Sequence, residues 1–293
     1  MAIVTLMITA TAMLTSIAWT SGPDGDLAIV PFQSAPFPHS SREDGYQTKA
    51  KFYPKDPHYV DASVGIFIPK GFVPTSHVNF VVHFHGHNNH VTQVFEQYSL
   101  AKEMHDSGVN AVLIVPQGPK DAADSGDGKL QHESGSLKAL LNEAMANLKS
   151  EGRIPFKSEI SHVALTTHSG GYLVTSAILG RNELPGKLTD VILFDSTYGG
   201  LPLMAKWCAD DHSRRLISIC TEHLGHENAQ FIALLQKLHV QPRVFLEEDV
   251  TDSEVVKRGP MFVLTTTLEH NEVIAKRHFF SQWLKPLSSR WGK

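Results

Sequence analysis

Residues 162–172 read His-Val-Ala-Leu-Thr-Thr-His-Ser-Gly-Gly-Tyr, and this stretch decides the fold. Its apolar residues 163–166 predict a short buried strand, and an apolar helical pattern follows the two glycines. Ser169 lies between them among small residues, as in a nucleophile elbow, where a tight turn exposes the serine hydroxyl. Thr167 stands where that motif usually has glycine, whereas Gly171 keeps its place. The alternative is an ordinary loop in which the serine caps the next helix.

Strands and helices alternate on both sides of this stretch. Apolar segments predict strands at residues 59–69, 78–85, 109–115, 188–194, 215–220 and 261–265. Between these strands lie stretches whose apolar residues recur at helical spacing. Such alternation predicts a mostly parallel sheet with helices on both faces and functional loops at the carboxyl ends of the strands. Residues 90–107 and 273–284 are each predicted to form one helix, and residues 244–250 a strand or a loop. No large cap domain is expected, because the connection after residues 188–194 is only about 20 residues long.

Length and composition indicate one domain. The chain has 293 residues, 42% of them hydrophobic, which is enough for one large core. Residues 2–18 form a mostly apolar, uncharged run that ends in Ser16-Ile17-Ala18 and lacks a basic start. This run predicts a signal peptide over residues 1–20, with a buried helix or a misassigned start codon as alternatives. Residues 21–48 are predicted to be irregular, and residues 49–293 to form the domain. We therefore expect an exported protein, periplasmic or secreted, without stable membrane insertion once the leader is removed.

Charge and cysteine content narrow the class of partner. The formal net charge of −4, without a basic cluster, argues against a nucleic-acid partner. Two cysteines, Cys208 and Cys220, are too few for a disulfide framework, and the sequence leaves a bridge between them open. No cofactor or metal is expected.

Histidines are frequent at the end of the strand at residues 78–85 and directly after it, in the run 83–90, His-Phe-His-Gly-His-Asn-Asn-His. The His-Gly pair before His87 is well placed for an oxyanion hole, because backbone N–H groups just past Gly86 can point at a developing oxyanion. The N–H of Gly170, directly after Ser169, would be the second donor. We therefore predict that the backbone of His87 and Gly170 forms this hole.

A base and an acid stand at later strand ends. His270 follows the last predicted strand and is the candidate general base. Asp195 ends the strand after the elbow, and Glu222 follows the next strand, so either carboxylate could orient the imidazole. We favour Asp195, because a carboxylate at the end of a buried strand needs a partner, whereas Glu222 lies in a polar loop.

In this order of nucleophile, acid and base the chain resembles the α/β-hydrolase superfamily, over about residues 59–284. More narrowly, Thr-His-Ser-Gly-Gly, Phe-Asp-Ser-Thr-Tyr-Gly and Glu-His-Asn-Glu-Val resemble a branch of exported bacterial hydrolases. The resemblance implies an eight-stranded type of sheet and acyl-transfer hydrolysis through a seryl intermediate on Ser169, His270 and Asp195.

The function that we predict is hydrolysis of carboxylic esters, with a small-molecule or exposed ester as substrate. An amidase or peptidase on the same residues is the first alternative. A metal-dependent hydrolase is the second, because alternation places several of the histidines on one side of an extended strand, where imidazoles can bind zinc; its ligands would be His83, His85, His87 and His90. The third is a non-catalytic binding protein with a hydrolase fold.

Overall fold

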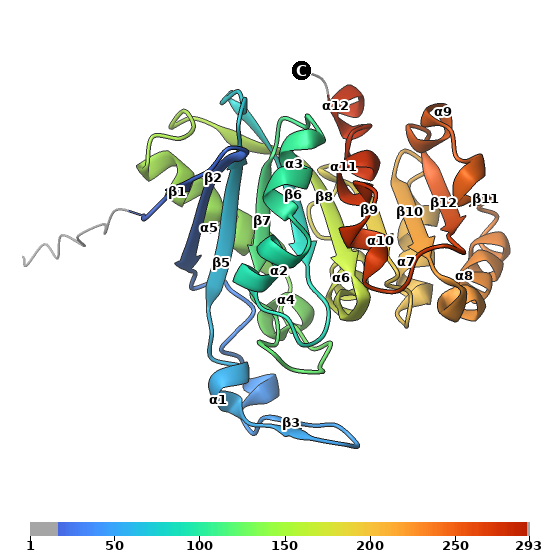
Figure 1. Ribbon diagram of the computed structural model, residues 1–293, viewed down its shortest axis with the longest axis horizontal. Coiled ribbons are helices and arrows are strands. Elements are labelled where there is room, and N and C mark those ends of the chain that lie inside the picture. Colours follow the sequence, from blue (N-terminus) through green and yellow to red (C-terminus); the bar gives the residue numbers. More distant parts are fainter. Residues whose placement is uncertain (1–16, 292–293) are drawn as a thin grey trace, which may run out of the picture.

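Ten strands form the central sheet of the computed structural model, which describes residues 17–291 (Figure 1). The strand order is β1-β2-β5-β7-β6-β8-β9-β10-β12-β11. The seven strands β7-β6-β8-β9-β10-β12-β11 are parallel to one another. Strands β5, β2 and β1 extend the sheet beyond β7, and each is antiparallel to its neighbour. Their bounds are β1 Thr20–Ser21, β2 Gly25–Pro31, β5 Ser63–Pro69, β6 His77–Phe84, β7 Val112–Pro116, β8 Glu159–His168, β9 Leu188–Phe194, β10 Arg215–Cys220, β11 Arg243–Leu246 and β12 Gly259–Leu264.

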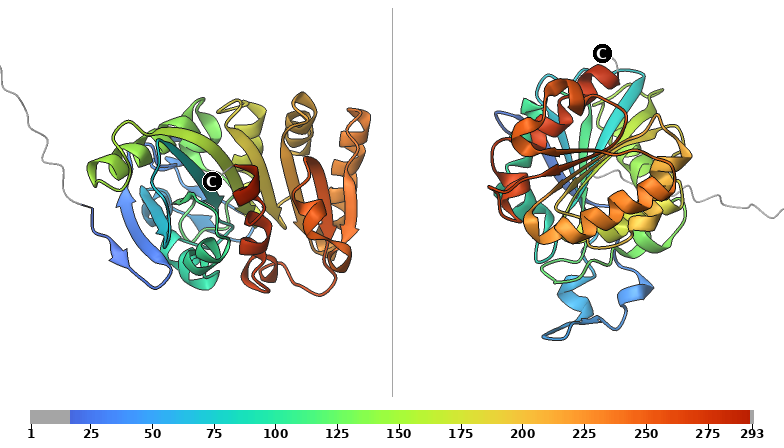
Figure 2. Two further views of the ribbon diagram at one scale, coloured as in Figure 1. Left: turned by 90° about the horizontal axis from the view of Figure 1, so that it is seen from above. Right: turned by 90° about the vertical axis from the view of Figure 1, so that its right-hand side faces the viewer.

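Helices cover both faces of this sheet (Figure 2). One face packs against helices α5 Ser136–Ser150, α6 Tyr172–Gly180, α7 Leu201–Asp210 and α8 Gly225–Lys237. The other packs against α2 Val91–Gln97, α3 Leu100–Asp106, α10 Glu272–Ala275, α11 Phe279–Leu284 and α12 Leu287–Arg290. The remaining helices are α1 Lys55–His58, α4 Gly128–His132 and α9 Asp252–Val255.

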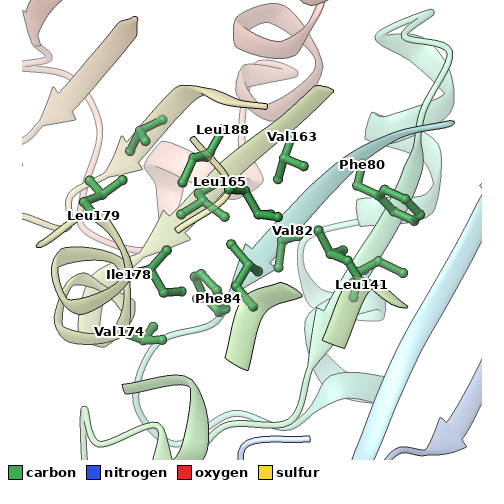
Figure 3. Close-up of a cluster of buried hydrophobic side chains, with 14 of the residues drawn as sticks. Phe80, Val82, Phe84, Leu141, Val163, Leu165, Val174, Ile178, Leu179 and Leu188 are labelled. Carbon is green, nitrogen blue, oxygen red and sulfur yellow. The ribbon is translucent and has the colours of Figure 1, made fainter. Parts of the chain in front are cut away.

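Alternating side chains of the central strands fill two hydrophobic cores, one on each face of the sheet. In β6, Phe80, Val82 and Phe84 point to the α5–α6 side, whereas Val81 belongs to the core on the opposite face. Successive side chains of a strand point to opposite faces, so an almost continuous apolar run fills both. Figure 3 shows the first core, where side chains of β6 and β8 meet Val174 and Ile178 of α6. The prediction of a mostly parallel, two-faced sheet is confirmed.

The connection that would hold a cap domain is short. It joins β9 to β10 through residues 195–214 and contains α7, which packs on the sheet. No cap is inserted there, as predicted.

Several local predictions were wrong. The segment 21–48 is not irregular throughout, since β2 pairs with β5 along its whole length, and the sheet has ten strands instead of eight. The helix predicted over residues 90–107 is divided into α2 and α3 at Ser99, which has a φ of 50°. Likewise Arg277 and His278, with φ of 58° and 56°, separate α10 from α11. A left-handed residue stops the hydrogen-bond ladder of a helix without changing its apolar pattern.

A small projecting segment precedes β5 (Figure 1). It contains α1 and a two-stranded sheet of β3 Tyr46–Gln47 and β4 Phe52–Tyr53, and the buried side chains Phe37, Tyr53, Tyr59 and Ala122 tie it to the body. Both cysteines are free and buried.

The predicted signal peptide lies outside the described residues except for its last few, so export stays a prediction. Within residues 17–291, none of the helices combines the length and the apolar character that a membrane crossing requires.

Candidate active site

Ser169 stands directly after β8, at the start of a short 3-10 turn, Ser169–Gly171, that leads into α6. Its φ of 52° is left-handed, a strained conformation for a non-glycine residue and one that a nucleophile elbow requires. Ser196 stabilises the turn by donating a hydrogen bond to the Ser169 carbonyl oxygen at 2.7 Å. A Cβ atom on Gly171 would lie 2.2 Å from Thr167 Oγ1. The same Cβ atom would also lie 2.9 Å from the backbone oxygen of Phe84, so glycine is needed at 171.

The structure brings Ser169, His270 and Asp195 together from three loops. His270 Nε2 lies 2.8 Å from Ser169 Oγ, and His270 Nδ1 lies 2.7 Å from Asp195 Oδ2. Asp195 follows the last residue of β9, and His270 lies in the loop between β12 and α10. Glu222, the alternative acid, is exposed in the turn Glu222–Leu224, and the carboxylate beside His270 is that of Asp195.

Asp195 is fully buried but hydrogen-bonded at both oxygens. The backbone N–H of Thr221 donates to Oδ1 at 2.9 Å, and the Thr221 hydroxyl donates to Oδ2 at 3.0 Å. Burial by itself would raise the pKa of Asp195, but the hydrogen bonds from His270 and Thr221 outweigh it and lower the pKa below the ordinary value. The carboxylate is therefore ionised and held in place near neutral pH.

The loop that contains His87, one predicted oxyanion donor, packs closely against the turn at Ser169, which contains the other, Gly170. A Cβ atom on Gly86 would stand 2.7 Å from Ser169 Cβ, and one on Gly170 would stand 2.6 Å from the His87 ring. The main chain at Gly86 thus approaches Ser169 as closely as glycine allows. Asn88 N–H is used elsewhere, in a hydrogen bond to Ala122 O at 2.9 Å, which fixes the loop.

The four histidines of the run at 83–90 do not converge. Each has a partner of its own: His83 contacts Thr166 Oγ1 at 3.0 Å, His85 contacts Gly86 O at 2.8 Å, His87 contacts Ser125 Oγ at 2.8 Å and His90 contacts Asp121 at 2.8 Å. The groups of potential metal ligands found among residues 17–291 are Asp195–His223–His270 and Glu103–Asp106–His278. The structure therefore does not assemble the ligand set that the metal alternative named.

His168, which was not predicted as a site residue, contacts the candidate base His270. Its buried ring stacks on His270 with centroids 4.8 Å apart, and its Nε2 lies 3.0 Å from the His270 carbonyl oxygen. Burial lowers the pKa of His168 to about 4, so the ring is neutral and Nε2–H can donate this bond. The only feature of the sequence that could have indicated a role for His168 in the site is its position next to Ser169.

Tyr198 and His223 also join the site without having been predicted. Tyr198 Oη lies 2.9 Å from His223 Nε2 and 3.4 Å from His270 Nδ1. Burial raises the pKa of Tyr198 to about 12, so the hydroxyl stays protonated. Tyr198 follows β9 and His223 follows β10, and these two strands are neighbours in the sheet. Their proximity could have been predicted only from that strand pairing.

A pocket of about 440 Å³ opens over the serine. Ser169 and His270 line it, together with residues that include Gly86, His87, Tyr172 and Tyr198. The hydroxyl, the imidazole and the backbone of the predicted oxyanion loop therefore face one space that a small molecule or an exposed chain end could enter.

No protein-family model and no curated protein matches the chain. Among solved structures, an S-formylglutathione hydrolase from Agrobacterium tumefaciens is similar over 94% of this chain and 99% of its own, with a TM-score of 0.53 and 12% identity. A mutant of the feruloyl esterase module from Clostridium thermocellum, complexed with sinapinate, is similar over 92% and 96%, with a TM-score of 0.51 and 13% identity. At this identity the likeness concerns the fold, and together with the sheet and the elbow it shows that this chain has the α/β-hydrolase fold.

Proposed function

We propose that this protein is a serine hydrolase that cleaves carboxylic esters through an acyl-enzyme intermediate. The observation that carries the proposal is the continuous contact from Ser169 Oγ to His270 and from His270 to Asp195, at 2.8 Å and 2.7 Å. Nucleophile, base and orienting acid within hydrogen-bond distance are what acyl transfer by serine requires. The strained φ of Ser169 and the glycine at 171 support the same role.

The proposed reaction begins when Ser169 Oγ attacks the ester carbonyl carbon and His270 Nε2 takes the hydroxyl proton. The carbonyl oxygen becomes an oxyanion, for which the backbone N–H groups of His87 and Gly170 are the proposed donors. His270 then gives its proton to the leaving alkoxide, and the alcohol departs. Water attacks the acyl group with His270 again as base, which releases the acid and restores Ser169.

Two further contacts support His270 as the base. Asp195 accepts from Nδ1, which leaves the Nε2 lone pair facing Ser169, and His168 holds the backbone of the same residue. Both contacts reduce the freedom of the imidazole before substrate arrives, so little ordering is left for the reaction itself.

The proposal is tested with p-nitrophenyl esters of graded acyl length, alongside the matching anilides. We expect ester turnover in the wild type and a loss of about 10⁴-fold or more in Ser169→Ala, because the variant lacks the hydroxyl that is proposed to form the acyl-enzyme. Circular dichroism checks that the variant is folded. Faster turnover of anilides than of esters would instead indicate an amidase, and an undiminished rate in Ser169→Ala would refute the seryl mechanism.

A further inference from the structure

A second imidazole shares the carboxylate of Asp195. His223 follows β10, the strand that pairs with the Asp195-bearing strand β9, and its Nδ1 lies 3.4 Å from Asp195 Oδ2. His270 Nδ1 approaches the same oxygen at 2.7 Å. The three potential ligand atoms lie within 4.8 Å of one another. Nothing in the proposed hydrolysis uses His223.

We propose that Asp195, His223 and His270 form a binding site for a divalent transition-metal ion of the zinc type, and that the bound ion switches the hydrolase off. Two imidazole nitrogens and one carboxylate oxygen form a donor set that zinc accepts in proteins. Ligands at about 2.0–2.2 Å from a tetrahedral ion stand roughly 3.4 Å apart. The His223–Asp195 separation of 3.4 Å already matches this value, and the His270–Asp195 pair at 2.7 Å has to open slightly.

The surroundings allow this adjustment. The side chain of His223 is 46% exposed and that of His270 is 30% exposed, so an ion can arrive from solvent, and the more exposed His223 ring can turn toward it. Thr221 N–H holds Asp195 through Oδ1, and Oδ2 becomes free for the ion once the Thr221 hydroxyl, which donates to it at 3.0 Å, turns away. The Thr221 hydroxyl, now 2.6 Å from His223 Nδ1, has to rotate away.

Tyr198 provides the outer partner that a metal-bound histidine usually has. Its hydroxyl lies 2.9 Å from His223 Nε2. When Nδ1 binds an ion, the ring proton resides on Nε2 and is donated to Tyr198, which fixes the ring orientation. The site thus has three ligands and a second layer that orients one of them.

The bound ion would act on the base through its tautomer. In the metal-free site the ring proton of His270 is on Nδ1, facing Asp195, and Nε2 is free to accept from Ser169. An ion on Nδ1 takes that position, so the proton moves to Nε2 with no net change in the protons bound. A protonated Nε2 cannot accept the serine proton, and acyl transfer stops. This second half of the inference rests on the proposed function, whereas binding of the ion does not.

Binding is tested by calorimetric titration of the full chain, freed of metal with EDTA, with zinc chloride. We expect one ion per chain, and an affinity lower by about 100-fold in His223→Gln, since one of three protein ligands is gone. His226→Gln is the matched control, because His226 is an exposed histidine close by on α8 that is not part of the site, and it should bind as the wild type does. Absence of binding, or equal binding by His223→Gln, would overturn the site.

Inhibition is tested with the ester assay, each variant being compared with its own metal-free rate. Zinc should abolish turnover of the wild type and of His226→Gln over the range in which it binds, EDTA should restore it, and His223→Gln should need about 100-fold more zinc. Unchanged or faster turnover at saturating zinc would overturn the switch while leaving the site. If the metal-free protein hydrolyses no ester, the proposed function fails and the titration alone decides the site.

Discussion

Asp195 is the residue whose surroundings most constrain the proposed chemistry. It is fully buried, follows a buried strand, and its φ of 47° is left-handed. An isolated carboxylate would be costly there, and His270 and Thr221 supply the hydrogen bonds that offset this cost. The geometry therefore favours Asp195 over Glu222 as the group that orients His270.

This preference is tested by paired amide substitutions. Asp195→Asn should lower turnover by about 10⁴-fold, because an amide donates to His270 Nδ1 and leaves the proton on the wrong nitrogen. Glu222→Gln, at an exposed position, should stay close to the wild-type rate. Turnover of p-nitrophenyl esters is the measurement, and the reverse pattern would transfer the acid role to Glu222.

The lowered pKa of His168 predicts how the free energy of unfolding depends on pH. Its pKa is about 4 in the folded protein and 6.5 as the ordinary value, so the unfolded chain binds a proton that the folded chain refuses. Stability linked to His168 is therefore fully present above pH 6.5 and is lost as the pH falls toward 4. Between about pH 7 and pH 5 the loss is about 2 kcal/mol.

Urea unfolding at these two pH values checks this. In His168→Gln, which cannot titrate, the free energy of unfolding should depend less on pH by that amount. His83, whose pKa burial also lowers, leaves part of the dependence in place. The exposed His226→Gln serves as control and should keep the full dependence. An unaltered dependence in His168→Gln would show that this ring titrates in the folded protein as it does in the unfolded chain.

Among the elements, α3 and α11 are joined by one buried carboxylate. Glu103 of α3 accepts from His278 Nδ1 at 2.8 Å and from the backbone N–H of Ser281, in α11, at 3.0 Å. α11 packs against the sheet after the loop that carries His270. The contact thus anchors α11, which follows the His270 loop, to α3.

Loss of this carboxylate should destabilise the fold without changing the chemistry. Glu103→Ala should lower the free energy of unfolding by about 2 kcal/mol, since a buried N–H loses a charged acceptor. Lys102, the residue before Glu103, forms an exposed ion pair with Asp106. Lys102→Ala removes this pair and should leave stability near that of the wild type. Urea unfolding measures both, and equal stabilities in the two variants would contradict the assigned role of Glu103.

For the whole molecule, the pattern of apolar segments predicted most of the sheet. Each of the three residues proposed for catalysis follows a buried strand, and parallel strands bring their carboxyl ends to one edge, so the site could be expected from chain order. β2 was not predicted, because its pairing with β5 is a long-range contact and the four apolar residues 27–30 do not by themselves indicate a strand. The breaks at Ser99 and His278 were missed because left-handed residues leave the helical spacing unchanged.

The part of the site that could not be predicted depends on tertiary contacts. Tyr198 and His223 meet only because β9 lies beside β10, and His168 supports His270 from a position 102 residues away. Side-chain type alone did not distinguish them from the other histidines and tyrosines of the chain. Strand order, and not local pattern, carries this information.

Covalent labelling tests the central claim most directly. A fluorophosphonate probe reacts with an activated serine, and intact mass followed by peptide mapping locates the adduct. We predict one adduct per chain, on Ser169, in the wild type and in Ser125→Ala, which removes a different serine of the same pocket. Ser169→Ala should take up no probe. An adduct that persists in Ser169→Ala, or that maps to another residue in the wild type, would contradict the account.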